Sequence, residues 1–91
     1  MKRILLVEDD PDSSLVMSRL LRSTGYDVEA AHSIFSALGL AQAATFDLVL
    51  CDIGLPDGTG YELMEQLHTR YALSGVAMSG YGMDEVIGLV P

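Results

Sequence analysis

The sequence of 91 residues has few basic residues and no long apolar run. No apolar stretch approaches the ~18 residues that a membrane-spanning helix needs, so we expect no membrane partner. Thirteen acidic residues outnumber five basic ones, which gives a net charge of −8, and the basic residues are scattered along the chain. Direct binding to nucleic acid is therefore not expected, because such affinity depends largely on neutralising phosphates.

Cysteine is equally scarce, since Cys51 is the only one and cannot form an internal disulfide. Cys51 lies in an apolar run, so we interpret it as a core residue. Acidic residues follow Lys2 and Arg3 within a few positions, which excludes the apolar core of a signal peptide. These features predict a cytoplasmic protein, and the length predicts one domain over residues 1–91.

Three short apolar runs read as strands that are buried on both faces, as in a parallel sheet. They are Ile4 to Val7, Leu48 to Cys51 and Val76 to Met78. A fourth segment, Asp27 to Ala30, alternates polar with apolar residues, which predicts a strand at the sheet edge with one face in water.

In the segments between these strands, apolar residues recur at the spacing of an amphipathic helix. Local signals mark three helix starts: Asp10 before Pro11, Ser33, and Thr59 with Glu62. The alternation of strands and helices predicts an α/β fold with a doubly wound parallel sheet. We expect one more helix to begin near Met83 to Leu89.

Acidic residues follow two of the predicted strands. Glu8, Asp9 and Asp10 come after the first strand, and Asp52 ends the third. In the flavodoxin-like strand order 2-1-3-4 these strands are neighbours, so at least three carboxylates converge. Such a cluster either raises a pKa or binds a hard cation such as Mg²⁺. Acidic residues just before a helix also interact favourably with the helix dipole, and we interpret Asp10 as a residue of this kind.

Three segments, ILLVEDDPD, LVLCDIGLPDGTGYEL and VAMSG, occur in an order that resembles response regulator receiver (CheY-like) domains, from Lys2 to about Tyr81. The resemblance implies that Asp52 is the phosphoacceptor and Ser79 the hydroxyl that binds the phosphoryl group. It also implies a Mg²⁺ site, with ligands from Asp9, Asp52, the backbone carbonyl of Gly54 and, through bound water, Glu8.

The resemblance further implies a role in a two-component phosphorelay. The donor would be the phosphohistidine of a sensor histidine kinase or histidine phosphotransfer protein, and the phosphorylated domain would switch a partner-binding surface. Such a module assists its own phosphorylation but is not a turnover enzyme. Chemistry supports these roles, because a carboxylate nucleophile gives an acyl phosphate and a cation stabilises the charged transition state.

The sequence departs from the family after the predicted fourth strand. The family continues to a fifth strand with a lysine and an aromatic switch residue, and then to a fifth helix, whereas this sequence ends at Pro91. Lys2 is the only lysine and lies before the first strand. We therefore expect the fifth βα unit to be missing, the fourth strand to be an exposed edge, and self-association through that edge.

Two other functions stay open on these residues. The first is a phosphorylation-incompetent, receiver-like interaction module that keeps the fold without the chemistry. The second, a flavin-dependent enzyme on the same fold, is disfavoured because acids at the end of the first strand would repel the phosphate of FMN.

Overall fold

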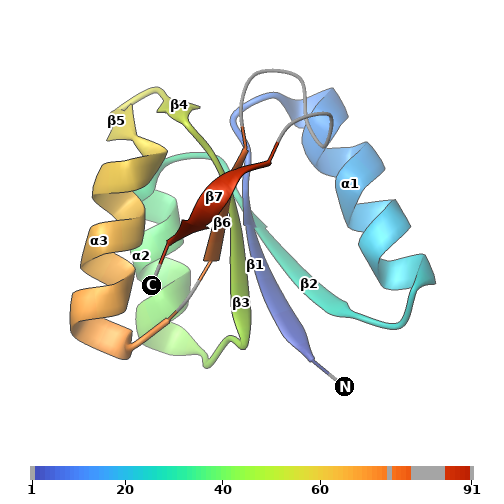
Figure 1. Ribbon diagram of the computed structural model, residues 1–91. Coiled ribbons are helices and arrows are strands. Elements are labelled where there is room, and N and C mark those ends of the chain that lie inside the picture. The colour runs from blue at the N-terminus through green and yellow to red at the C-terminus, as the bar shows by residue number, and fades with distance from the viewer. Residues whose placement is uncertain (1, 74, 79–85, 91) are drawn as a thin grey trace.

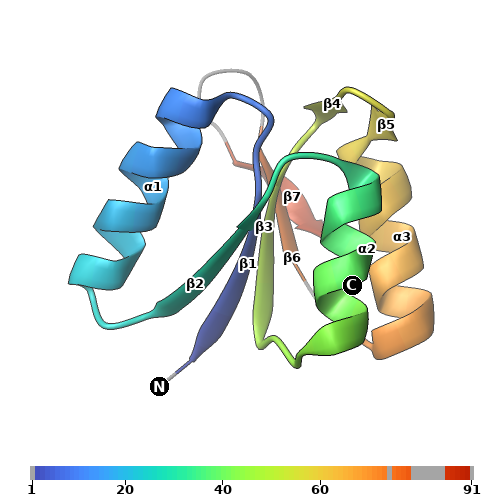
Figure 2. The ribbon, with the colours of Figure 1, turned by 180° about the vertical axis from the view of Figure 1, so that it is seen from behind.

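A computed structural model of the protein describes residues 2–73, 75–78 and 86–90. Figures 1 and 2 show a central sheet with α1 on one face and α2 and α3 on the other. The helices are α1 (Pro11–Ser23), α2 (Ile34–Ala43) and α3 (Gly60–Tyr71). The strands of the sheet are β1 (Arg3–Val7), β2 (Asp27–Ala31), β3 (Leu48–Asp52), β6 (Gly75–Met78) and β7 (Val86–Val90). In the described part of the chain, no helix is long and apolar enough to cross a bilayer.

The strand order is β2-β1-β3-β6-β7, and the first four of these strands run parallel. This confirms the predicted flavodoxin-like α/β fold with its order 2-1-3-4. Between β1 and β3 the register pairs Ile4 with Leu48 and Val7 with Cys51. The next residues along each strand, Glu8 and Asp52, therefore leave the sheet at the same level.

The three predicted helix starts are confirmed by hydrogen bonds between side chains and backbone. Asp10 accepts from the Ser13 amide at 3.2 Å, and Thr59 accepts from the Glu62 amide at 3.2 Å. Ser33 and Ser36 cap each other reciprocally at the start of α2. These bonds satisfy amides that have no partner within the first helical turn.

β1 is buried on both faces, as its continuous apolar sequence predicts. Leu5 and Val7 pack towards α2 and α3, whereas Ile4 and Leu6 pack towards α1. The edge position of β2 is also confirmed by the strand order, and Asp27, Val28 and Glu29 are exposed, buried and exposed in turn. A larger core lies on the α2 and α3 side and includes Cys51, Leu63, Met64 and Leu67.

The face that α1 turns to the sheet differs from the simple apolar pattern of its sequence. The helix buries Ser14, Met17 and Ser18. Leu15 and Leu20, by contrast, are 50% and 45% exposed. The small serines are buried where the two leucines are not, so hydrophobicity alone does not decide which residues of α1 are covered.

Among the described residues, two expectations were wrong: that a helix begins near Met83 to Leu89, and that the fourth strand is an exposed edge. Val86–Val90 form strand β7, which pairs antiparallel with β6, and not part of a helix. β6 is therefore not the edge of the sheet among the described residues. The segment VIGLV places four apolar residues around Gly88, three of them β-branched, and this composition favours a strand over a helix. β6 also offers backbone groups that need partners.

The start of α3 packs directly against the end of β3. The Gly60 amide donates to the Ile53 carbonyl at 2.6 Å, and a Cβ atom at Gly60 would collide with the Asp52 carbonyl oxygen. Gly60 is also fully enclosed by its surroundings. A side chain at this position would force α3 away from the segment that carries Asp52.

We expect Gly60→Ala to lower the free energy of unfolding by about 1–3 kcal/mol, because backbone atoms must move to admit the methyl group. Urea denaturation followed by circular dichroism measures this change. Gly39→Ala is the matched control, since Gly39 is exposed in the middle of α2 and a Cβ there meets nothing within 4 Å. The control should raise stability by about 0.5–1 kcal/mol. Changes of the same sign in both variants would contradict the close approach.

Candidate functional site

Three carboxylates meet at the carboxyl ends of β1 and β3. Glu8 is the first residue after β1, and Asp52 is the last residue of β3. Carboxylate oxygens of Glu8, Asp9 and Asp52 all lie within 4.8 Å of one another. The structure thus brings together three of the residues that the sequence suggested, from segments more than 40 positions apart.

The cluster is partly withdrawn from water. Glu8 is 3% exposed and Asp52 is 9% exposed, whereas Asp9 is exposed. Burial raises the pKa of Glu8 to about 7, and the charges of Asp52 and Asp9 add to this rise. Burial also raises the pKa of Asp52. The protein therefore resists full ionisation of the cluster in the absence of a cation.

Backbone hydrogen bonds hold the two buried carboxylates in place. The Asp10 amide donates to Glu8 Oε1 at 3.1 Å, and the Ile53 amide donates to Asp52 Oδ1 at 2.9 Å. The Glu8 amide donates to the Ala31 carbonyl at 3.0 Å. These contacts orient the carboxylates without neutralising their charge.

Asp10 is turned away from the cluster and serves α1. Its Oδ2 accepts from the Ser13 hydroxyl at 2.7 Å and from the Ser13 amide, and these bonds lower the pKa of Asp10. The interpretation of Asp10 as a helix-capping residue is therefore confirmed. The His32 ring places its Nδ1 at 3.1 Å from the Glu8 carbonyl oxygen.

The donor set fits a small, hard divalent cation. Such ions prefer carboxylate and water oxygens, and Mg²⁺ binds them at about 2.1 Å, so opposite ligands lie about 4.2 Å apart. Oxygens that lie within 4.8 Å of one another match a site in which some carboxylates bind directly and another through water. A cation would also offset the repulsion that raises the pKa of Glu8.

Two other predicted site residues, Gly54 and Ser79, are not part of the carboxylate cluster itself. Gly54 lies two residues after Asp52 at the start of β4 (Gly54–Leu55), and a hydrogen bond from its backbone amide opposes the burial that raises the pKa of Asp52. The role of Gly54 as a carbonyl ligand stays a prediction. Ser79 lies outside the described residues. Lys2 precedes β1, at the opposite end of the sheet from Asp52.

One further contact, which involves Asp57, was not predicted from the sequence. This residue lies between β4 and β5 (Gly58–Thr59), in the loop that follows Asp52. Its carboxylate accepts from the Ile34 amide at 2.8 Å and the Phe35 amide at 3.0 Å, and these bonds lower the pKa of Asp57. The feature of the sequence that could have indicated this contact is that the first turn of α2 contains no acidic residue of its own.

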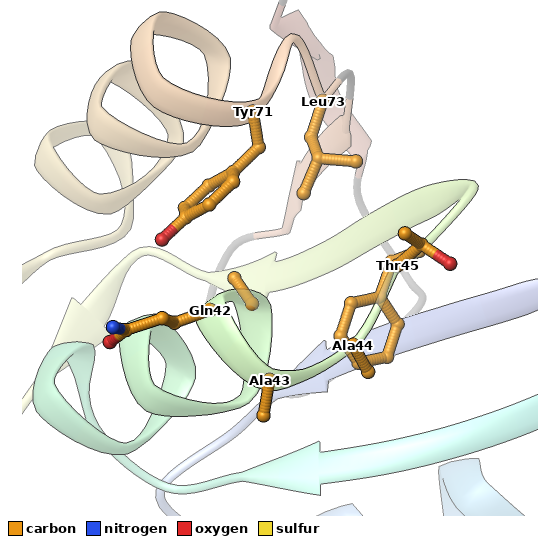
Figure 3. Close-up of a pocket in the computed structure, with 8 residues that line it drawn as sticks. Gln42, Ala43, Ala44, Thr45, Tyr71 and Leu73 are labelled. Atoms are coloured by element: carbon orange, nitrogen blue, oxygen red, sulfur yellow. The ribbon is translucent and has the colours of Figure 1, made fainter.

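A hollow of about 350 Å³ lies at the other end of the molecule, near the carboxyl ends of α2 and α3 (Figure 3). Its lining contains no carboxylate, histidine or cysteine that could act with the cluster. The lining residues are Ala41, Gln42, Ala43, Ala44, Thr45, Phe46, Tyr71 and Leu73. The carboxylate cluster therefore carries the reactive chemistry that the described residues offer.

Comparisons with known proteins agree with the fold. The profile of the response regulator receiver domain family matches residues 4–88. The response regulator PilR of Pseudomonas aeruginosa is 33% identical over 82 residues, which cover 89% of this chain and 18% of PilR. The chain thus spans less than a fifth of that relative.

Solved receiver domains are also similar to this chain. The HemR receiver domain of Leptospira biflexa is 36% identical with a TM-score of 0.81, over 87% of this chain and 64% of that one. The response regulator TrrA of Thermotoga maritima, solved with Mg²⁺-BeF, is 28% identical with a TM-score of 0.83. The similarity covers 90% of this chain and 72% of TrrA. TrrA has also been solved in complex with the histidine kinase ThkA.

The fold and the acidic cluster define a class of α/β proteins whose polar site lies where parallel strands β1 and β3 end. With the family profile matched over residues 4–88, the chain belongs to the response regulator receiver domain family.

The raised pKa of Glu8 makes the stability of the metal-free protein depend on pH. The folded state holds a proton on Glu8 up to about pH 7, whereas the unfolded state releases it near 4.5. This contribution to stability is full below the unfolded pKa and is lost as the pH rises through the folded pKa. In EDTA, we expect the free energy of unfolding to fall by on the order of 2 kcal/mol from about pH 5 to about pH 8.

Glu8→Gln provides the control for this pH dependence, because the amide keeps the shape of the side chain and does not titrate. Urea denaturation at several pH values should show a flatter profile for the variant than for the wild type. Identical slopes in the two proteins would contradict the assignment of the pH dependence to Glu8.

Proposed function

We propose that this chain is the phosphoacceptor receiver module of a two-component phosphorelay. The Asp52 carboxylate attacks the phosphorus of a phosphohistidine, so that an O–P bond forms on Asp52 while the N–P bond to the donor imidazole breaks. The product is an acyl phosphate, a covalent and reversible mark. The observation that supports this proposal is the convergence of Asp52 with Glu8 and Asp9.

The surroundings of Asp52 suit a nucleophile that is held in position. The residue ends a buried strand, and the Ile53 amide fixes its Oδ1 atom. The close packing of Gly60 against the Asp52 backbone limits movement of the same segment. Such positioning matters because phosphoryl transfer has a loose transition state, for which alignment and charge stabilisation supply most of the catalysis.

Mg²⁺ is the cofactor that we propose for this site. Asp9, Asp52 and the Gly54 carbonyl would hold it directly, and Glu8 would act through bound water. When bound, the ion supplies positive charge that offsets the charge of the phosphoryl oxygens. The complex of the related TrrA with Mg²⁺-BeF supports this assignment.

The donor that we propose is a sensor histidine kinase or a histidine phosphotransfer protein. The complex of TrrA with the kinase ThkA supports a partner of this kind. The module acts in the cytoplasm and is not a turnover enzyme, because the phosphorylated protein itself is the signal. Ser79 binds the phosphoryl group and couples it to a change in a partner-binding surface.

Mg²⁺ should raise the melting temperature, since a ligand that binds only the folded state stabilises it. Asp9→Asn should melt at a higher temperature than wild type in EDTA, because one repelling charge is gone. The same variant should bind Mg²⁺ about tenfold more weakly. Scanning fluorimetry over a magnesium titration measures both effects.

Glu65→Gln is the control for the loss of one charge, since Glu65 is an exposed residue of α3 outside the cluster. It should bind Mg²⁺ as the wild type does. An equal loss of affinity in both variants, or no response of the wild type to millimolar magnesium, would argue against the site.

Incubation with magnesium and acetyl phosphate should add one phosphoryl group to the intact mass, and the modification should be labile to base. Asp52→Asn should abolish it, because an amide is a poor nucleophile. We expect the wild type to react slowly, because Lys2 lies at the opposite end of the sheet and cannot stabilise the transferred group.

The alternative function is a phosphorylation-incompetent interaction module, and the position of Lys2 is the observation that favours it. The same experiment separates the two functions. If the wild type takes up no phosphoryl group under conditions that label an intact receiver domain, the interaction module is the better description.

A further inference from the structure

The hairpin that follows Asp52 is anchored at its tip to a helix that lies far away in sequence. β4 and β5 pair antiparallel, with Gly54 opposite Thr59 and Leu55 opposite Gly58. Pro56 and Asp57 form the tip of this hairpin. Asp57 then reaches the first turn of α2 through two hydrogen bonds, at 2.8 Å to the Ile34 amide and 3.0 Å to the Phe35 amide.

The two Asp57 hydrogen bonds are additional to the N-cap of α2, which is Ser33. Ser33 already accepts from the Ser36 amide and forms a reciprocal capping pair with that residue. Asp57 instead takes the first two amides of the helix, which Ser33 leaves free. It also brings a negative charge to the positive end of the helix dipole, where α2 has no acidic residue of its own.

The backbone of the hairpin is shaped for this contact. Gly58 adopts φ +154°, and a Cβ atom there would lie 2.6 Å from Ile34 Cδ1 and 3.1 Å from Glu62 Oε2. The missing side chain lets the tip lie directly against the start of α2. At its base, the Ile53 carbonyl that accepts from Gly60 fixes the hairpin to α3.

We infer that Asp57 is a positioning residue for the phosphoacceptor site, which holds the β4–β5 hairpin in the orientation that cation binding and phosphorylation require. This inference rests on the proposed function, because the hairpin begins at Gly54, whose carbonyl is the proposed ligand. Fixing the hairpin before the cation binds lowers the ordering cost of binding. Residues that orient ligands in this way typically affect metal affinity about 10- to 100-fold.

The test compares Asp57→Ala with Ser33→Ala. Both variants remove a contact at the start of α2, but only the first releases the hairpin. We expect Asp57→Ala to weaken Mg²⁺ binding about tenfold or more and to slow phosphorylation by acetyl phosphate to a similar degree. Ser33→Ala should change both quantities less than about twofold while it lowers stability. Asp57→Asn, which keeps one acceptor oxygen, should give an intermediate effect.

A measurement on the metal-free protein separates positioning from a general loss of stability. ¹⁵N relaxation of the Gly54 and Thr59 amides should show increased mobility in Asp57→Ala and not in Ser33→Ala. If Asp57→Ala does not fold, the same comparison is made with Asp57→Asn. Unchanged hairpin mobility and unchanged Mg²⁺ affinity in the variant that folds would overturn the inference.

The two proposals fail in different ways. If the wild type binds no Mg²⁺ and takes up no phosphoryl group, the proposed function fails, whereas the relaxation measurement still shows whether Asp57 restrains the hairpin. If the wild type is active and the Asp57 variants match the wild type in Mg²⁺ affinity and in rate, only the role of Asp57 is overturned.

Discussion

The parallel pairing of β1 with β3 is the constraint on which the site depends. Because Val7 lies opposite Cys51, the following Glu8 and Asp52 emerge at the same edge of the sheet. A shift of one residue in this register would turn Asp52 to the other face of the sheet. The pairing is secured by side chains that are fully buried, such as Leu5, Val7 and Val49, so the apolar core fixes the geometry of a polar site.

The resulting cluster is unfavourable by itself, and the surrounding structure holds it together. Three carboxylates within 4.8 Å repel one another, and burial raises the pKa values of Glu8 and Asp52. Backbone amides orient these groups but cannot neutralise them. A fold that maintains such an arrangement favours any cation that relieves it, which links the stability of the protein to its proposed cofactor.

The segment after Asp52 is held in place by contacts with two helices. Gly60 brings α3 against the Asp52 backbone, and the β4–β5 hairpin begins within two residues of Asp52. Asp57 then connects the tip of that hairpin to α2. The loop is therefore fixed by both helices on one face of the sheet, which suits a segment that carries the proposed phosphoacceptor.

The sequence by itself determined the strands at Ile4 and Leu48, the helix caps at Asp10 and Ser33, and the convergence of Glu8 with Asp52. These features depend on short-range periodicity and on the rule that parallel strands end at one edge. Only the tertiary structure decided that Ser14 and Ser18, not Leu15 and Leu20, face the sheet, that Val86–Val90 pair with β6, and that Asp57 contacts Ile34 and Phe35. Each of these depends on which distant backbone comes close, and residue type and spacing along one segment contain no information about that distance.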